Sequence, residues 1–406
     1  MNIPGKPLVA SVTKHLGDVS TLQGWAYLPD CLLHSILAML YSSLDLVAFA
    51  ATCISWRVAF FAYPSKSVFR TLCPPLLIQQ RLGIQAPTIN GPRNRYTFKF
   101  IDPSNPKTNR RCQIREEILL EFRYAGSCYG HLIFFHNKDC LVVDAFSGAE
   151  VSPPRLHSVT ELYYCSTLTA PLASPNSHLL VSAESSLFDW QVGSDSWSEL
   201  KISNVRIKQI VELNGQFIAM DDRMKIYTLQ LSPKLVLRDL PVEWCHGKTP
   251  RMCLKPWLVV CHDMLLMGCY DLRFPFQRSA FCTLHRLDMS INPAKWMEMK
   301  KRKIFYPPFS CMNPERWGGS SNCMYDTQGS QPWGVRWLGN QPDLAKDPST
   351  GRDLMFTRNM LQQLQSLWVY PSMFYSNGPY CSSSFFSTPP PPPPNFNVEA
   401  RILHRC

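Results

Sequence analysis

One apolar stretch decides the N-terminal part of the fold: residues 25–57, WAYLPDCLLHSILAMLYSSLDLVAFAATCISWR. Its charged residues are Asp30, Asp45 and Arg57, and large apolar side chains dominate the rest. The spacing of these apolar side chains predicts three short helices. Helices this apolar cannot bury all of their surface against one another, so we expect the remaining face to bind a partner.

The first expected helix has Asp30 placed to cap its start. Its apolar positions are Leu32, Leu33, Ile36, Leu37 and Leu40. The second helix can be capped by Ser42, Ser43 or Asp45. Its apolar positions follow the i, i+3, i+4, i+7 pattern, at Leu46, Phe49, Ala50 and Cys53. The third runs through residues 55–60 and must end before Pro64, because a proline disfavours helix in the residue ahead of it.

Two other interpretations of this stretch are open, a transmembrane helix and an ordinary helical hairpin of a larger core. A membrane span would place Asp45 towards its middle, where a charge costs about 2.5 kcal/mol or more. A core hairpin explains the apolar faces. It does not explain why a Leu-Pro-Asp start at residues 28–30 is combined with a Trp-Arg end at residues 56–57.

The order and spacing of several short motifs in this stretch resemble an F-box. These motifs are Leu28-Pro29-Asp30, Leu32-Leu33, Ile36-Leu37, Leu44-Asp45-Leu46, Ala51-Thr52-Cys53 and Ser55-Trp56-Arg57. The resemblance implies a small helical module that docks on a Skp-type adaptor of a cullin-RING ubiquitin ligase. It also implies the residues that meet the adaptor or support that surface, namely Leu28, Pro29, Leu32, Ile36, Leu37, Leu46 and Trp56.

The bulk composition fits a globular protein of two domains. The chain has 406 residues, of which 45% are hydrophobic and 12% aromatic. Residues 1–20 contain no unbroken apolar core of a secretory signal. We therefore expect the 16 scattered cysteines to be reduced in a cytoplasmic or nuclear protein. Because the chain has no Cys-x-x-Cys pair, we expect no structural zinc site.

The net charge of +11 favours acidic proteins or nucleic acid as encounter partners. The basic excess is spread along the chain, and its densest run is residues 300–303, KKRK. One cluster of four basic residues is more typical of a solvated turn than of a nucleic-acid site. We therefore do not expect nucleic acid to be the partner.

From about residue 115 onward, the hydrophobic period predicts strands. Pairs of apolar runs recur with a period of roughly 40 to 60 residues, in or near the range of propeller blades. The pairs are 131–135 and 140–144, 178–181 and 186–190, 214–219 and 225–229, 262–267 and 281–287, and 322–326 and 331–335. This pattern predicts about five repeat units of a β-propeller, with a sixth hidden in the connector or the tail. A β-sandwich is the alternative.

Three motifs in this region resemble the uncharacterised domain that follows the F-box in many plant, especially grass, F-box proteins. They are Cys128-Tyr129-Gly130-His131 with the Asp144 turn, Trp257-Leu258-Val259-Val260, and the run from Cys311 to Gly319. The resemblance covers about residues 110–340 and implies a propeller-like domain. It supplies no catalytic residue.

The predicted fold class is therefore a multidomain α+β chain, in which a small three-helix F-box precedes a mostly-β, propeller-like domain. The expected boundaries are a leader at 1–24, the F-box at 25–64, a connector at 65–110, the β domain at 111–340 and a tail at 341–406. The connector is punctuated by prolines. In the tail, residues 353–368 can form an amphipathic helix, and six prolines at 389–394 predict an extended spacer.

The sequence contains no motif for catalysis or for a bound cofactor. It lacks a Gly-x-x-x-x-Gly-Lys phosphate loop, a Gly-x-Ser-x-Gly elbow and a His-Glu-x-x-His helix. We therefore expect a non-catalytic subunit of a ubiquitin ligase that binds no metal or cofactor. Its partners would be the Skp-type adaptor, through it a cullin-RING core, and a target protein. The alternative is a scaffold that holds an adaptor without any cullin.

Overall fold

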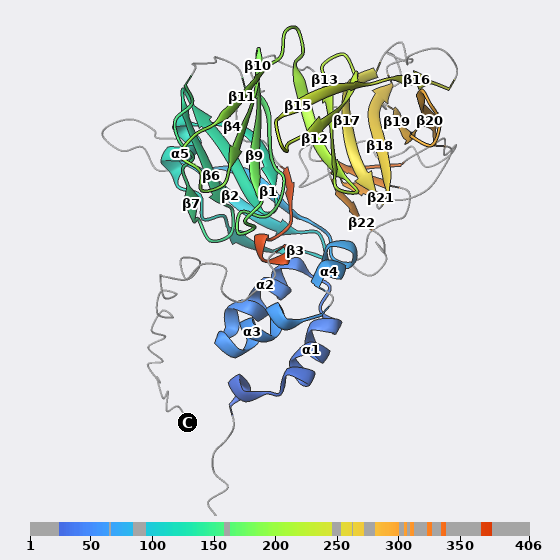
Figure 1. Cartoon of the computed structure of the whole chain (residues 1–406). Helices are drawn as coiled ribbons and strands as arrows, with labels where there is room; N and C mark the ends of the chain where they lie inside the picture. The colour runs from blue at the N-terminus through green and yellow to red at the C-terminus, as the bar shows by residue number, and fades with distance from the viewer. Residues whose placement is uncertain are drawn as a thin grey trace, which may run out of the picture.

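The computed structural model of the chain shows a small helical module beside a larger body of β-sheets (Figure 1). The structure describes residues 24–64, 66–83, 95–157, 163–245, 253–261, 263–271, 281–299, 304–306, 309–311, 323–326, 334–337 and 367–375. The predicted spacer at 389–394, the KKRK run at 300–303 and residues 353–366 of the predicted tail helix lie outside these ranges.

The helical module contains the three predicted helices and a fourth. Its elements are η1 (Trp25–Tyr27), α1 (Asp30–Met39), α2 (Ser43–Thr52), α3 (Ile54–Ala62) and α4 (Lys66–Leu72). Ser42 caps α2, because its hydroxyl accepts a hydrogen bond from the backbone N–H of Asp45 at 3.1 Å. The predicted cap of α1 is wrong: Pro29 holds the N-cap position, and Asp30 is the first helical residue. No helix in the described ranges is long and apolar enough to cross a membrane.

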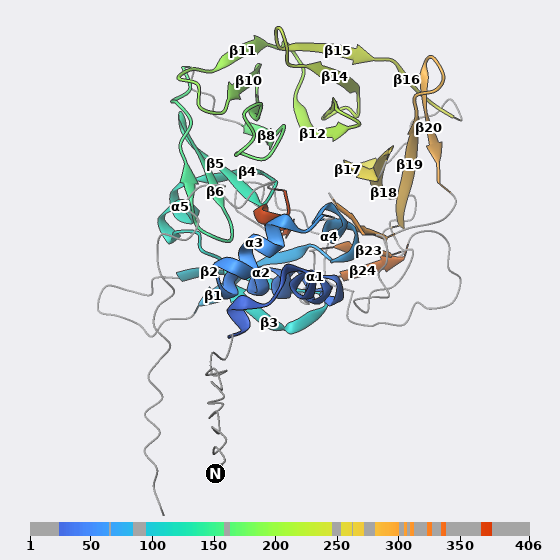
Figure 2. The same ribbon diagram turned by 60° about the horizontal axis from the view of Figure 1, so that its bottom comes forward.

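The β-sheets form a propeller, which settles the choice between a propeller and a sandwich. Six sheets succeed one another around a ring (Figure 2). Two of the sheets consist of β4 (Arg123–Cys128), β5 (His131–His136), β6 (Asp139–Asp144) and β7 (Glu150–Val151), and of β8 (Tyr163–Leu168), β9 (His178–Ala183), β10 (Ser186–Gln191) and β11 (Ser198–Lys201). A third sheet consists of β12 (Ile207–Leu213), β13 (Gln216–Asp221), β14 (Ile226–Gln230) and β15 (Val236–Leu240).

The remaining sheets complete the ring. One contains β16 (Val242–Trp244), β17 (Cys253–Cys261), β18 (Met264–Asp271), β19 (Phe281–Asp288) and β20 (Ala294–Glu298). Another contains β21 (Ile304–Tyr306), β22 (Phe309–Cys311), β23 (Cys323–Asp326) and β24 (Gly334–Trp337). The apolar runs that the sequence pairs overlap ten strands, namely β5, β6, β9, β10, β13, β14, β18, β19, β23 and β24. In the sheets that begin with β4, β8 and β12, the first strand lies innermost in the ring. For this reason β8 contacts both β4 and β12.

The sixth sheet joins the connector to the tail, and here the structure differs from the predicted boundaries. Its strands lie in the order β25 (Leu367–Val369), β1 (Leu76–Gly83), β2 (Arg95–Asp102) and β3 (Asn105–Arg111). The connector is thus part of the propeller, and residues 367 and 368 belong to a strand instead of a helix. Prolines hid these strands from the sequence pattern, because Pro74 and Pro75 directly precede β1 and Pro106 lies within β3.

Apolar side chains fill the space between neighbouring sheets. One cluster joins Ile78 of β1 and Phe100 of β2 to Phe134 of β5, and the next joins Ile133 of β5 to Val181 and Phe188. The sheets of β5, β9 and β13 have apolar side chains on both faces, so none of these sheets could be stable in water by itself. The ring solves this by stacking every sheet between two others.

Eight of the described cysteines follow the predicted reduced state, and Cys269 does not. Eight described cysteines are free thiols, among them the buried Cys73, Cys112, Cys140 and Cys165. Burial raises the pKa of Cys112 to about 12, so this thiol stays protonated and unreactive at neutral pH. Cys269 on β18 is instead disulfide-bonded, which contradicts the expectation for that residue.

Candidate functional site

The helical module carries most of the large apolar side chains that the described part of the chain exposes. Eight of the eleven such side chains lie between Trp25 and Val68. They are Trp25, Tyr27, Leu32, Met39, Tyr41, Ile54, Val58 and Val68. An apolar surface concentrated in one small module is typical of a binding site for another protein.

Helix α1 has one face inside the module and another in solvent. Leu33 and Leu37, spaced by one turn, are fully buried. On the other side, Leu32 is 50% exposed and Met39 is 66% exposed, with the half-buried Ile36 between them. The spacing of 32, 36 and 39 places these three side chains on one stripe along the helix. This apolar stripe is available to a partner.

Helix α3 adds a second exposed stripe. Ile54 is 77% exposed and Val58, four residues later, is 42% exposed. Between them Trp56 turns inward, where its ring packs against Phe49 at a centroid distance of 4.6 Å. The indole N–H of Trp56 donates to the carbonyl of Trp25 at 2.8 Å. Trp56 therefore fixes η1 to α3 and so positions the exposed Trp25.

The seven residues that the F-box resemblance implies occupy three environments. Leu37 and Leu46 are fully buried, so they can support the surface but cannot touch a partner. Leu28, Ile36 and Trp56 are half-buried, whereas Pro29 and Leu32 are exposed. The sequence reasoning missed Met39, Tyr41, Ile54 and Val58. The helical spacing could have identified Met39, because residues 32, 36 and 39 are separated by four and three positions and so lie on one face of a helix.

A buried carboxylate joins the helical module to the propeller. Asp102, at the end of β2, is fully buried and accepts a hydrogen bond from the Ser42 hydroxyl at 2.6 Å. The same oxygen accepts from the backbone N–H of Leu44 at 3.2 Å, in the first turn of α2. The other oxygen accepts from the backbone N–H of Ser104 at 2.8 Å. A carboxylate at a helix N-terminus also meets the positive end of the helix dipole.

The C-terminal segment completes the core of the helical module. After β25, the turn η5 (Ser372–Phe374) brings Phe374 to within 6.1 Å of Phe60 and 6.0 Å of Phe69, measured between ring centroids. The Tyr370 hydroxyl donates to the carbonyls of Arg70 and Cys73, at 2.7 and 3.0 Å. The helical module therefore has no separate core, because residues some 300 positions away fill part of it.

The turn between β4 and β5 also touches this junction. A Cβ atom placed on Gly130 would lie 2.3 Å from the backbone nitrogen of Ser372. The neighbouring Tyr129 ring meets the Tyr375 ring edge-on at 4.9 Å, and the guanidinium of Arg70 lies over Tyr375 at 4.8 Å. Burial raises the pKa of Tyr375 to about 12, so the phenol stays neutral. The junction is therefore closely packed.

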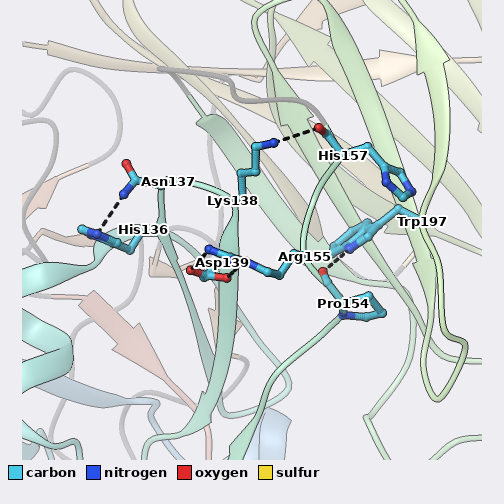
Figure 3. A network of polar contacts seen from close by, with 8 residues as sticks. All are labelled: His136, Asn137, Lys138, Asp139, Pro154, Arg155, His157 and Trp197. Atoms are coloured by element: carbon cyan, nitrogen blue, oxygen red, sulfur yellow. Dashed lines mark hydrogen bonds and ion pairs between the residues drawn. The ribbon is translucent and has the colours of Figure 1, made fainter.

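A polar network on the propeller links two neighbouring sheets. Figure 3 shows the turn between β5 and β6 beside the connection that leads to β8. Arg155 binds both carboxylate oxygens of Asp139, at 2.7 and 3.1 Å. Trp197 donates its indole N–H to the carbonyl of Pro154 at 2.6 Å. These contacts tie one sheet to the next, and they bring together no nucleophile with a base.

The propeller also has an open pocket of about 350 Å³. It is lined by residues of β11, β14 and β15 and their connections, including Lys201, Tyr227, Lys234 and Asp239. The amine of Lys201 is paired with Glu199 and that of Lys225 with Asp239, so the charges at this pocket are largely balanced. Within the described residues, no group of His, Cys, Asp and Glu is arranged to hold a metal ion.

Comparison with protein families identifies the propeller. Residues 100–302, half of the chain, match the KIB1-4 beta-propeller. The chain belongs to this family. The matched KIB1-4 beta-propeller segment begins within β2 and runs past β20, so it contains four complete sheets of the ring. It also contains β3 and the junction carboxylate Asp102.

Solved structures resemble the chain only distantly. A streptogramin B lyase aligns with 11% identity and a TM-score of 0.34, covering 56% of this chain and 76% of the lyase. The extracellular domain of the putative one component system BT4673 from B. thetaiotaomicron aligns with 9% identity and a TM-score of 0.33. The alignment covers 57% of this chain and 30% of that domain. The N-terminal domain of Nup159 aligns with 9% identity and a TM-score of 0.25. The alignment covers 47% of this chain and 63% of the Nup159 domain. Scores this low carry no functional argument. No curated protein matches the chain.

Proposed function

We propose that this chain is a plant F-box protein, the substrate-receptor subunit of a Skp–cullin–F-box ubiquitin ligase. In this proposal the helical module binds a Skp-type adaptor, the adaptor brings the cullin-RING core, and the propeller binds a target protein. The chain itself is non-catalytic and works in the cytoplasm or the nucleus. The KIB1-4 beta-propeller, which accompanies F-boxes in plants, supports the combination of the two parts.

One observation carries the proposal, namely the exposed apolar stripes of α1 and α3. Leu32, Met39, Ile54 and Val58 remain in solvent although the core of the module, which includes Leu33, Leu37, Leu46 and Phe60, is fully packed. Fully burying an exposed side chain of this size contributes roughly 1.5–3 kcal/mol. These four side chains are 42–77% exposed, so each would contribute the corresponding part of that free energy on association. Four such side chains are enough to make a partner protein stabilise the module strongly.

The rigid junction supports the same proposal. A ubiquitin ligase of this kind needs no catalytic side chain in the receptor, because it raises the effective concentration of the target near the ubiquitin carrier. That effect is largest when the two binding parts keep a fixed distance and orientation. The Asp102–Ser42 bond and the packing of Phe374 on Phe60 hold the helical module against the propeller in this way.

The experiment is a pull-down with a purified Skp-type adaptor. We compare the wild type with Leu32→Asp/Ile54→Asp, which places two charges on the exposed stripes. The matched control is Met289→Asp/Ile291→Asp, because these side chains are 42% and 43% exposed but lie on the propeller, between β19 and β20. The expected result is loss of adaptor binding in the first variant alone. Equal retention by all three proteins would refute the proposal.

A second measurement concerns the ligase itself. The proposal expects a cullin to co-purify with the adaptor when the wild-type chain is isolated from cells, and the Leu32→Asp/Ile54→Asp variant to lose both. Recovery of the adaptor without any cullin would instead favour the scaffold, in which the same module holds an adaptor for a purpose other than ubiquitination.

A further inference from the structure

Strand β3 is an exposed edge strand with an unusual concentration of positive charge. The order β25-β1-β2-β3 places β3 at the outer end of its sheet. Residues 95–111 contain five basic residues and one acidic residue, Asp102, which is fully buried. On β3 itself, Lys107, Arg110 and Arg111 are all exposed. We call these three side chains the β3 cations.

The β3 cations have no acidic partner among the described residues, whereas several other exposed basic residues of the propeller have one. Arg115 is paired with Glu150 at 2.6 Å, and Arg155 with Asp139 at 2.7 Å. Similar pairs hold Lys201 and Lys225. No ion pair with an Asp or Glu side chain is found for Lys107, Arg110 or Arg111 in the part of the chain that the structure describes.

The register of the sheet places a fourth basic residue next to the β3 cations. Arg111 pairs directly opposite Lys99 on β2. Like charges that face each other across two strands repel and lower the stability of the sheet.

The β3 cations lie beside the surface that we assign to the adaptor. The turn between β2 and β3 carries Asp102, whose carboxylate binds Ser42 and the N–H of Leu44 at the start of α2. The residue before Ser42 is Tyr41, which is 48% exposed. Figure 2 shows β3 on the same side of the ring as α1 and α2. At about 3.4 Å per residue, Arg111 lies roughly 20 Å along β3 from that turn, within the footprint of one bound protein.

We propose that the protein bound by the helical module is acidic and that its acidic surface contacts the β3 cations. This inference rests on the proposed function and deepens it, because it gives the adaptor a second point of attachment on the propeller. Apolar stripes supply affinity, whereas opposite charges steer the encounter and fix the orientation. The contact would therefore align the adaptor with the propeller and its target.

Two other roles for the same side chains make different predictions. Charges on an edge strand can simply prevent edge-to-edge pairing of sheets, which requires no partner. A basic strand can also bind the phosphates of nucleic acid, with an affinity that falls steeply with salt. Neither role links the β3 cations to the association of a protein with α1 and α3.

The test measures association of the full chain with a purified Skp-type adaptor by stopped flow, at low and high salt. The variant is Lys107→Glu/Arg110→Glu/Arg111→Glu, and a neutral version carries glutamine at the same three positions. The control reverses three exposed cations of the sheet β12–β15, in Arg223→Glu/Lys234→Glu/Arg238→Glu. Folding of each variant is checked by thermal unfolding and size-exclusion chromatography.

We expect charge reversal on β3 to slow association about tenfold or more at low salt, with the glutamine variant in between. At about 1 M salt, where the Debye length falls to about 3 Å, the difference should nearly disappear. Unchanged association in the β3 variant, or an equal loss in the control, would overturn the inference while leaving the proposed function intact. Absence of adaptor binding by the wild type would overturn both. Binding of a single-stranded RNA that depends on the β3 cations, with adaptor association unchanged, would favour nucleic acid instead.

Discussion

The bond between Ser42 and Asp102 should contribute more to stability than any other polar contact of the helical module. The Ser42 hydroxyl acts twice: it donates to the buried carboxylate at 2.6 Å and accepts from the backbone N–H of Asp45 at 3.1 Å. Losing an N-cap costs about 1 kcal/mol. Losing a buried hydrogen bond to a charged group costs about 1.5–3 kcal/mol. We therefore expect Ser42→Ala to lower the free energy of unfolding by about 3 kcal/mol.

Urea titration followed by circular dichroism measures this change. The matched control is Ser35→Ala, since the Ser35 hydroxyl also makes a hydrogen bond, to the carbonyl of Cys31 at 2.8 Å, but in an exposed position. That variant should stay within about 0.5 kcal/mol of the wild type.

A double-mutant cycle with Asp102→Asn separates the buried bond from the cap. Ser42→Ala removes this hydrogen bond, and Asp102→Asn removes the negative charge that strengthens it, so their effects should not add, with a coupling energy of about 1 kcal/mol or more. A loss below 0.5 kcal/mol in Ser42→Ala, or strict additivity in the cycle, would show that the junction is held by apolar packing alone.

Two further predictions concern the propeller. Gly130→Ala should destabilise the protein by about 2 kcal/mol or more, because a Cβ atom there meets the backbone of Ser372 at 2.3 Å and the φ angle is +80°. Gly193→Ala, at φ +89° with open space around it, should cost only the backbone strain of about 1 kcal/mol, and equal losses in the two variants would argue against the close packing of η5. Burial lowers the pKa of His131 from its ordinary value of 6.5 and outweighs the attraction of Asp144. As the pH falls through 6.5, the unfolded chain binds a proton that the folded chain does not, so stability should decrease. A urea midpoint that does not fall between about pH 7.5 and 5.5, or that falls equally in His131→Gln, would contradict this assignment.

The sequence predicted the elements whose signal is local. The helices α1 to α3 follow from the spacing of leucines and phenylalanines, and the end of α3 before Pro64 follows from the proline itself. The hairpin of β5 and β6 follows from two apolar runs around a short polar turn. In this hairpin the first residue of β5, His131, pairs with the last residue of β6, Asp144. For such elements the hydrophobic period is a sufficient guide.

Elements that depend on distant partners could not be predicted in the same way. β25 has three residues and is a strand because Leu76, Leu77 and Ile78 of β1 pair with it from the other end of the chain. No local pattern contains that information. The sequence predicted an apolar face on the helical module, but which side chains form it depends on how α1 packs against α3. For this reason Ile54 and Val58 were not recognised as surface residues.

The position of β25 has a consequence for how the protein is made. During synthesis the ring cannot be closed until residues 367–369 have left the ribosome, and the helical module lacks Tyr370 and Phe374 until the same moment. The helical module, which is made early, and residues 367–375, which are made late, thus mature together. A ribosome that stops before residue 367 releases a product with an open ring and an incomplete core in the helical module, which quality-control chaperones and proteases would recognise.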